Sequence, residues 1–414
     1  MSALEEAPAG GVQPGSALFW RTNVALFLAG FASFSLLYCV QPLLPLFVQA
    51  FGVGAAASSL ALSLATGALA VAIFGAGAWS DGRDKRGLMM GSMVLAAICN
   101  LVASQSPSWH GLLAARLVAG LVLGGVPAVA MAYLAERMSP QALGRSVGLY
   151  VAGTAFGGMT GRIGTSLAAE AWGWQAAMAG LSVLDLAAAL GFAWLLPKGA
   201  APKAGAPRAE RRSAVAHVHI WRAHLRHPAL PWLFLTAFLG VGAFVAIFNY
   251  VGFLLMAHPF GWRTAEIGWV FGAYVFAMAA SPLAGALADR VGPLPVISAG
   301  VAMAALGVSF TLSAQAWAVV TGIVGLTAGF FAVHAVASSW VGRLGGAHKG
   351  HATSLYLLAY YLGSSVLGSW GGHWWEWAAW PGVAGMALVA LAGVAACAWR
   401  LGLAAPRLRA ATAV

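Results

Sequence analysis

Four ionisable side chains lie inside long apolar stretches of this chain, where they could bind a ligand or move protons. They are Arg116, Arg162, Asp185 and His334. Ionisable groups are expensive inside a bilayer and are functional candidates there. A carboxyl or an imidazole can take up and release a proton, whereas a guanidinium binds anionic or polar groups. We therefore expect Asp185 and His334 to be candidate proton carriers and the two arginines to be candidate substrate contacts.

Each of these residues also has an ordinary structural interpretation. Asp185 can pair with a neighbour, His334 can be a hydrogen-bonded packing residue, and Arg116 can extend toward the membrane surface. Uncharged polar side chains in other apolar stretches enlarge the set of candidate cavity residues. That set comprises Arg116, Arg162, Tyr38, Gln41, Asn249, Tyr250, His334, Tyr360 and Tyr361.

The elements that carry these residues are long enough to cross a bilayer. The chain has 414 residues, of which 61% are hydrophobic and only 8% are charged. A soluble domain carries about 25% charged residues, and a membrane crossing needs about 20 apolar residues. We predict an all-α integral membrane protein with twelve transmembrane helices, at residues 22–47, 56–79, 87–104, 110–135, 146–168, 174–196, 229–256, 265–288, 293–313, 317–341, 352–371 and 378–401.

Basic residues gather at one set of helix ends. Of the 22 lysines and arginines, 19 lie in the tails, the middle linker or the loops on one side. Cytoplasmic loops are enriched in this way, so we expect both termini in the cytoplasm. The net charge of +11 then indicates contact with membrane lipid and does not indicate nucleic-acid binding. Tryptophans at the opposite ends, Trp174 and Trp380 among them, are expected to form an interfacial belt.

The two halves of the chain resemble each other. Residues 144–174 and 350–380 align at a constant offset of 206, with identities that include Tyr150 with Tyr356 and Gly157 with Gly363. Such repeats are typical of alternating-access transporters. We predict two pseudo-symmetric six-helix bundles, arranged as a cytoplasmic tail at 1–21, an N-terminal bundle at 22–196, a basic linker at 197–228, a C-terminal bundle at 229–401 and a tail at 402–414.

Two charged loops repeat at nearly the same offset. They read G-A-W-S-D-G-R-D-K-R-G at 77–87 and G-A-L-A-D-R-V-G at 285–292. A glycine lets two helices approach closely, and an aspartate at a helix end can meet an arginine or a helix N-terminus. We expect a cytoplasmic gate made of Gly77, Asp81, Lys85, Arg86, Gly285, Asp289 and Arg290. The alternative is a loop that only sets topology.

Small residues dot the segment at 146–168. Its glycines include Gly148, Gly153, Gly157, Gly158 and Gly161. Small residues make a flat helix face that lets backbones approach. We expect these five glycines to lie at the interface on which the bundles rock, with ordinary tight helix packing as the alternative.

The loop pair, together with Arg116 four residues before Gly120, resembles the major facilitator superfamily. L-Y-C-V-Q-P at 37–42, G-M-T-G-R at 158–162 and Y-Y-L-G-S-S at 360–365 look like its bacterial drug/arabinose-efflux branch. The resemblance implies two rocking bundles around a central site, proton-coupled export and an inner-membrane location. The first loop departs from the family pattern at Gly82 and Asp84. The family's drug–proton antiporters often carry an acid in the first helix, and residues 22–47 have none, which weakens antiport specifically.

We predict a secondary active transporter that exports a drug, sugar or metabolite by alternating access as a proton antiporter. The alternative is a facilitator or symporter that imports a metabolite or an organic anion held by Arg116 and Arg162. A third possibility, a receptor or enzyme, has no nucleophile–base pair, metal cluster or phosphate loop in its favour. We therefore predict no enzyme, cofactor or metal, and expect a monomer whose partners are its small-molecule substrate, protons and lipid.

Two histidine-bearing segments could be read as metal sites. The linker carries His217, His219, His224 and His227, and G-G-H-W-W-E-W at 371–377 carries His373 and Glu376. A basic helix on the membrane surface explains the first segment better. An interfacial aromatic anchor explains the second better.

Overall fold

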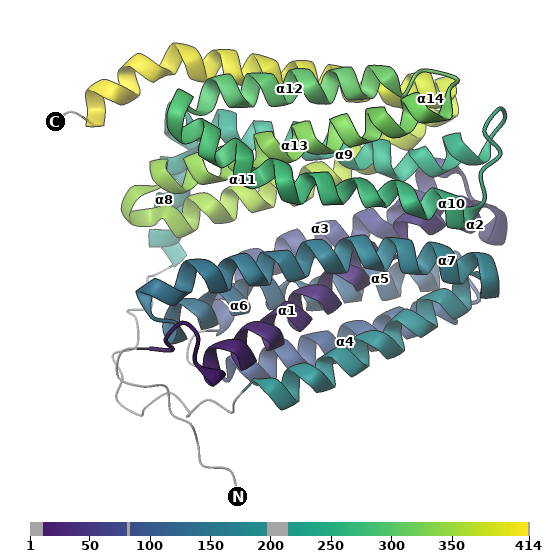
Figure 1. The fold of residues 1–414 in the computed structure, drawn as a ribbon, viewed down its shortest axis with the longest axis horizontal. Helices are drawn as coiled ribbons and strands as arrows, with labels where there is room; N and C mark the ends of the chain where they lie inside the picture. Colours follow the sequence, from purple (N-terminus) through teal and green to yellow (C-terminus); the bar gives the residue numbers. More distant parts are fainter. Residues whose placement is uncertain (1–10, 81–82, 197–213, 413–414) are drawn as a thin grey trace, which may run out of the picture. The chain divides into compact units, whose positions relative to one another are not determined.

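The computed structural model describes residues 11–80, 83–196 and 214–412, with side chains given for all of these except 74–80, 214–216 and 405–412. The chain separates into two compact units, which Figure 1 draws in sequence colours. Unit 1 comprises Met1–Leu46 and Leu64–Arg211, and unit 2 comprises Phe47–Ser63 and Arg212–Val414. By its contacts the short segment Phe47–Ser63 therefore groups with unit 2. The predicted bounds of the two bundles remain a prediction.

The first part of the chain is mostly helical, with short connections between the helices. Its elements are α1 (Ala17–Tyr38), the 3-10 turn η1 (Gln41–Leu43), α2 (Leu44–Phe51), α3 (Ala55–Ser80), α4 (Lys85–Ser104), α5 (Trp109–Leu123), α6 (Gly125–Arg137) and α7 (Pro140–Leu195). The second part repeats this plan after a linker helix. Its elements are α8 (Ala214–Arg226), α9 (Leu230–Met256), α10 (Thr264–Gly268), η2 (Trp269–Ala273), α11 (Tyr274–Val291), α12 (Pro293–Phe310), α13 (Ala316–Leu344), η3 (Gly346–His348) and α14 (Lys349–Thr412).

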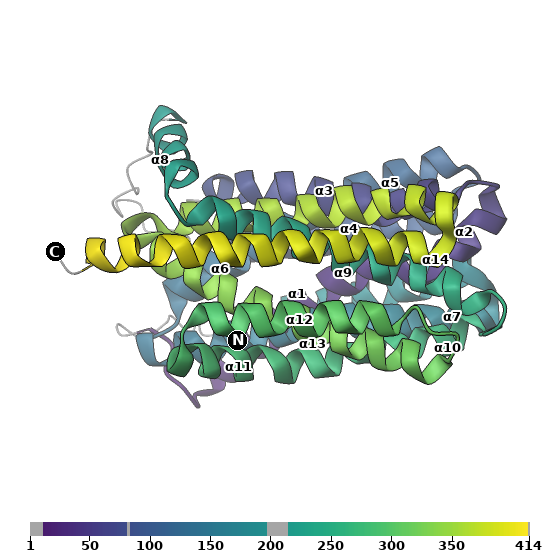
Figure 2. The ribbon, with the colours of Figure 1, turned by 90° about the horizontal axis from the view of Figure 1, so that it is seen from above.

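Two of these helices are too long for a single crossing. α7 has 56 residues and α14 has 64, whereas a crossing takes about 20. Each contains residues with non-helical dihedrals, at Gly173 in α7 and at Ala378 and Ala379 in α14. In Figures 1 and 2 the C-terminal arm of α14, in yellow, runs alongside α12.

The number of crossings follows from these two breaks. The described residues contain ten apolar spans of membrane-crossing length, and α7 and α14 each count as one of the ten. With each bent helix taken as two crossings, the total becomes twelve. The predicted fold class, two six-helix bundles, is confirmed.

The repeat seen in the sequence has a structural counterpart in both units. The breaks at Gly173 and Ala379 are separated by the same 206 residues as the sequence repeat. Tyr150 and Tyr356 are both buried. α7 packs along α1 in unit 1, and α14 packs along α9 in unit 2.

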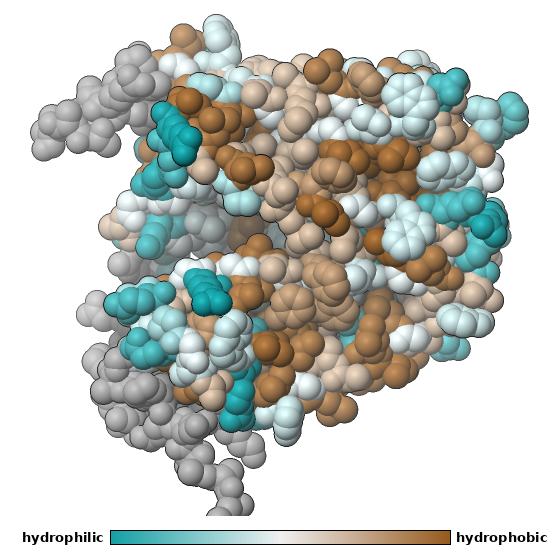
Figure 3. Space-filling view, viewed as in Figure 1, coloured by the Kyte–Doolittle hydropathy of each residue, from teal (hydrophilic) through white to brown (hydrophobic). Residues whose placement is uncertain are grey.

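The outer faces of the helices suit a lipid environment. Large apolar side chains such as Leu190, Trp194, Leu283 and Val389 are 68–81% exposed. Figure 3 shows hydrophobic side chains over the middle of the helices and hydrophilic ones nearer the helix ends. The tryptophan belt is only partly correct, since Trp174 and Trp380 are buried, and the Trp380 indole donates to the Thr311 carbonyl at 2.9 Å.

Three of the five glycines expected at the bundle interface pack against α1 of their own unit. A Cβ placed on Gly153, Gly157 or Gly161 would come within 2.8 Å of backbone atoms of α1 in the same unit. Gly158 faces the Arg162 side chain of its own helix, and a Cβ on Gly148 would meet nothing within 4 Å. For Gly153, Gly157 and Gly161, tight packing of α7 on α1 is therefore the observed role.

Candidate functional site

The first crossing, Ala17–Phe51, is broken after Tyr38, and the break organises the polar groups around it. α1 ends at Tyr38, and the η1 turn follows with Pro42 in its first positions. Proline lacks an N–H and cannot continue the helical ladder. The last carbonyls of α1 therefore need donors from elsewhere, because no water is present in a bilayer core.

Arg116 of α5 supplies those donors. Its Nη1 donates to the Leu36 carbonyl at 2.9 Å, and its Nη2 donates to the Leu37 carbonyl at 2.6 Å. A cation at a helix C-terminus also interacts favourably with the helix dipole. The side chain is completely buried, so Arg116 does not extend to the membrane surface.

Asn100 of α4 connects this contact to α7. Its carbonyl oxygen lies 3.4 Å from Nη1 of Arg116, and its amide donates to the Met178 carbonyl and the Ser182 hydroxyl, both at 3.0 Å. Sequence reasoning missed Asn100, although a buried amide in a membrane helix is itself a signal of interhelical bonding.

Arg162 of α7 holds the other side of the break. Its Nε donates to the Gln41 side chain at 2.6 Å, and its Nη1 donates to the Gly158 carbonyl at 2.6 Å. The guanidinium carbon lies 4.0 Å from the centre of the Tyr38 ring, a cation–π distance. The sequence could not show whether the two arginines share a location. The structure brings both to residues 36–41.

Asp185 of α7 lies beside the same segment without a cation. Ser35 Oγ is 3.0 Å and 3.1 Å from the two carboxyl oxygens. The same Oγ lies 3.0 Å from the Ala32 carbonyl. Within the described residues Asp185 has no ion pair, and its side chain is completely buried. The expected alternative, pairing with a neighbour, therefore takes the form of a bond to a hydroxyl.

In unit 2, His334 of α13 lies in an aromatic cluster. Its Nδ1 is 3.0 Å from the Tyr356 hydroxyl. The ring stacks on Phe330 and lies 4.8 Å, centre to centre, from Tyr360. Tyr360 in turn contacts the Tyr361 ring edge to face. His334 and Tyr360 are half-buried, so each retains surface that a ligand can reach.

The other two cavity candidates in unit 2 bind the backbone of α14. Asn249 donates to the Gly368 carbonyl at 3.1 Å, and the Tyr250 hydroxyl donates to the Ser369 carbonyl at 3.2 Å. Both residues are buried in α9. Their observed contacts fasten α9 to α14.

The expected cytoplasmic gate is only partly described. Asp81 lies outside the described residues, as do the surroundings of Gly77. Lys85 forms an ion pair with Glu136 at 2.8 Å. Arg86 donates to the Ala193 carbonyl of α7.

Asp84, one of the two residues at which the first loop departs from the family pattern, has a structural role. It accepts from the Arg86 amide at 3.1 Å and caps the start of α4, a role that aspartate performs well. In the second loop, Gly285 is half-buried and Asp289 and Arg290 are exposed at the end of α11. Within the part of the chain that is described, Asp289 has no ion pair.

Two histidines of the linker contact residues at the end of η3 and the start of α14. His217 Nδ1 lies 2.8 Å from His351 Nε2, and His224 Nε2 lies 3.3 Å from the His348 carbonyl. Residues 197–213 of the linker are outside the described range. Across residues with described side chains, no three His, Cys, Asp or Glu residues are grouped to hold a metal.

Comparison with known proteins agrees with this architecture. The family model of the Major Facilitator Superfamily matches residues 26–257 and 246–413. The "Inner membrane transport protein YnfM" of Escherichia coli is 39% identical over 368 residues, which are 88% of this chain and 86% of that protein. The "Uncharacterized MFS-type transporter YybF" of Bacillus subtilis is 38% identical over 365 residues, 88% of this chain and 89% of that protein.

Solved structures share the fold at low sequence identity. A bacterial homologue of the human lysosomal transporter Spinster has a TM-score of 0.75 at 14% identity and covers 93% of this chain and 96% of its own. The nucleoside transporter NupG has a TM-score of 0.74 at 13% identity and covers 92% of this chain and 99% of its own. The chain belongs to the major facilitator superfamily and is a multi-pass membrane transporter.

Proposed function

We propose that this transporter exports a small organic molecule, a drug, sugar or metabolite, in exchange for protons by alternating access. Its place is then the bacterial inner membrane, as the name of the Escherichia coli relative suggests, with both termini in the cytoplasm. The basic residues at one set of helix ends support this orientation. Membership of the drug/arabinose-efflux branch is part of the same proposal.

The observation that carries the proton proposal is the contact between Asp185 and Ser35. A charge buried without a partner is costly, and among the described residues Asp185 is bonded only to the Ser35 hydroxyl. That hydroxyl has one hydrogen and two neighbouring acceptors. If Ser35 donates to the Ala32 carbonyl, 3.0 Å away, the carboxyl must be protonated to bond Ser35 Oγ. If Ser35 donates to Asp185, the carboxyl is free to be ionised.

Rotation of one hydroxyl therefore accommodates both protonation states of Asp185. Neither state needs a movement of the helices, because the oxygen atoms already lie at hydrogen-bond distances. A site of this kind can load and release a proton. Asp185 is our proposed proton carrier, and His334, bonded to Tyr356, is the second candidate.

The substrate contacts are proposed to come chiefly from His334, Tyr360 and Tyr361. The first two retain exposed surface in the aromatic cluster of α13 and α14. Arg116 and Arg162 are instead directed at protein carbonyl and amide oxygens. These contacts support a positioning role, in which the arginines shape the break of the first crossing beside Tyr38 and Gln41.

Reconstitution into proteoliposomes tests the proposal. A thermal-shift screen of drugs, sugars and organic acids first identifies a ligand, since binding raises the melting temperature by mass action. An imposed pH gradient should then drive its uptake, and its addition should release protons. If neither occurs while counterflow is seen, proton coupling is wrong and the protein is a facilitator. Counterflow of a labelled organic acid with no response to an imposed pH gradient would favour the importer alternative.

A further inference from the structure

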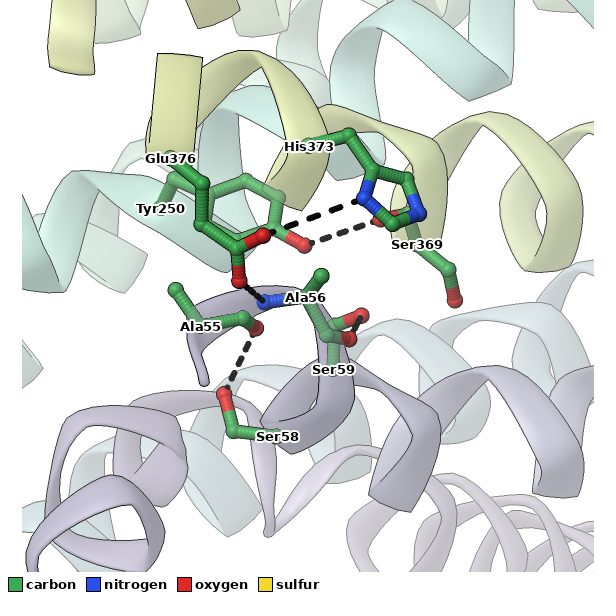
Figure 4. Close-up of polar contacts among 8 residues, drawn as sticks. All are labelled: Ala55, Ala56, Ser58, Ser59, Tyr250, Ser369, His373 and Glu376. Atoms are coloured by element: carbon green, nitrogen blue, oxygen red, sulfur yellow. Dashed lines mark hydrogen bonds and ion pairs between the residues drawn. The ribbon is translucent and has the colours of Figure 1, made fainter. Parts of the chain in front are cut away.

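Unit 2 contains a seam between the start of α3 and one face of α14, which Figure 4 draws. Residues 55–63 of α3 belong to unit 2, whereas residues 64–80 of the same helix are assigned to unit 1. One continuous helix is thus shared between the two units. Its residues include no proline.

Three contacts fasten the seam at successive turns of α3. The Glu376 carboxylate accepts from the Ala56 amide at 3.2 Å, the Tyr250 hydroxyl of α9 lies beside Ser59, and Ser365 donates to the Ser63 carbonyl at 2.6 Å. Positions 56, 59 and 63 lie on one face of a helix.

The contacts on the facing surface of α14 also recur about once per helical turn. Positions 365, 372 and 376 contact α3 directly, and the carbonyl of residue 369 accepts from Tyr250 of α9. These four positions also share one helix face. At Gly372 the two helices touch, since a Cβ there would lie 2.2 Å from Ala56 Cα. The absence of a side chain at this position allows the close approach.

Glu376 occupies the open end of the seam. It is 46% exposed, and its second carboxyl oxygen lies 3.8 Å from Nδ1 of His373. An anion at the N-terminus of a helix interacts favourably with the unpaired amides and the dipole of the helix. Since water reaches Glu376, the contact can be exchanged for solvent at little cost, unlike the buried contacts deeper in the seam.

A shared, proline-free helix limits how the units can move. Sharp helix bends occur at proline, at glycine or serine pairs, at π-bulges or where a group inserts into the ladder. α3 has no proline, and its one serine pair, Ser58 and Ser59, lies at its start. If α3 moves as one rod with residues 64–80, its first turns must part from α14. We propose that Glu376 is the latch of this seam, a positioning residue whose contact with Ala56 must break during the transport cycle.

Cysteine accessibility tests the latch in the full-length protein. The reporter is Ser369→Cys, because the Ser369 hydroxyl is buried without a hydrogen-bond partner among the described residues, and its carbonyl accepts from Tyr250, the α9 side chain that lies beside Ser59 of α3. The three native cysteines, all buried, are replaced by alanine. The rate of labelling by a water-soluble maleimide is then measured in proteoliposomes.

The latch predicts a graded result. Glu376→Ala should raise the labelling rate about two- to fivefold, the range expected for loss of an anion at a helix N-terminus. Glu376→Gln keeps an acceptor oxygen and should have a smaller effect. Gly372→Ala, which adds a methyl group against Ala56, should also raise the rate.

The matched control is Glu266→Gln. Glu266 also accepts from a backbone amide, Arg263 N at 2.8 Å, but that contact caps its own short helix α10. The labelling rate should stay at the parent value in this variant. Labelling at the parent rate in Glu376→Ala would overturn the latch.

General loosening is distinguished by retaining native Cys397 in parallel samples. If Glu376→Ala also increases the labelling of Cys397, the variant has loosened the protein in general, and the milder Glu376→Gln is used instead. A labelling rate of the Ser369→Cys reporter in Glu376→Gln equal to that of the parent would then contradict the proposal. None of these measurements needs a substrate or a proton gradient. Their outcome is therefore independent of the proposed coupling and direction.

Discussion

Gly157 and Gly363 make the same contact in the two units. A Cβ on Gly157 would lie 2.2 Å from the Phe31 carbonyl oxygen, and a Cβ on Gly363 would lie 2.1 Å from the Phe238 carbonyl oxygen. Glycine is required at both positions because any side chain would collide with backbone. The sequence repeat therefore corresponds to one packing arrangement that occurs in both units, between α7 and α1 and between α14 and α9.

Alanine substitution at these glycines should destabilise the protein. Overpacking of this kind costs about 1–3 kcal/mol, which exceeds the gain of about 0.5–1 kcal/mol for replacing glycine by alanine in a helix. Thermal unfolding in detergent should show lower melting temperatures for Gly157→Ala and Gly363→Ala. The controls are Gly164→Ala and Gly385→Ala, where a Cβ meets nothing within 4 Å. Equal stability in all four variants would argue against the contact.

Arg116→Lys should also lower stability. A lysine cannot reproduce the fork that reaches the Leu36 and Leu37 carbonyls together, and an unpaired buried carbonyl costs about 1–3 kcal/mol. Thermal unfolding measures the effect, with Arg290→Lys as the exposed control. A lysine variant as stable as the parent would show that the fork to the two carbonyls is dispensable.

Ser35 and Asp185 should be energetically coupled. Residues in direct contact typically show coupling of about 0.5–3 kcal/mol in a double-mutant cycle. The cycle combines Ser35→Ala with Asp185→Asn and measures unfolding free energy. Ser33→Ala is the matched control, since Ser33 is equally buried but donates only to the Ala29 carbonyl of its own helix. If the changes in unfolding free energy were additive in the Ser35 cycle, the hydroxyl and the carboxyl would not interact energetically.

His227 should make stability depend on pH. Its Nδ1 accepts from the Ala229 amide at 3.1 Å and the Leu230 amide at 3.3 Å at the start of α9, so only the neutral ring can cap the helix. Burial, and to a smaller extent the neighbouring His224, lowers the pKa of His227. The unfolded chain thus binds the proton more readily, and stability should fall as the pH drops below about 6.5.

The measurement for His227 is a comparison of melting temperatures near neutral and mildly acidic pH. Relative to His227→Ala, the parent should be more stable at neutral pH by about 1 kcal/mol, the usual size of a capping interaction. This advantage should disappear in acid. An advantage that grows on acidification would contradict the capping role.

The helices were predictable because lipid-facing segments must be long and apolar. The continuity of α7 and of α14 was not predictable, because the sequence suggested two separate helices in each place, with gaps near 169–173 and 372–377. In the structure each pair reverses direction within one or two residues, at Gly173 and at Ala378 and Ala379. Such a reversal leaves little polar loop to recognise.

The sequence predicted which charged residues belong to the candidate site, but it did not predict the groups that these residues contact. Arg116, Arg162 and Asp185 were conspicuous because charges are rare in apolar segments. Their partners are largely backbone carbonyls, which have no sequence signature, or neutral residues such as Ser35 and Asn100. The assignment of residues 47–63 to unit 2 depends on long-range packing that no local pattern encodes.

Proton movement in Asp185→Asn tests directly whether Asp185 carries the coupled proton. Proteoliposomes containing an internal pH indicator are given a ligand identified by thermal shift, and proton flux and ligand counterflow are measured together. Asp185→Asn should retain counterflow and lose coupled proton flux, whereas Glu170→Gln, a change at an exposed carboxyl on the same helix, should behave like the parent. Unchanged proton flux in Asp185→Asn would contradict the role of Asp185 as the proton carrier.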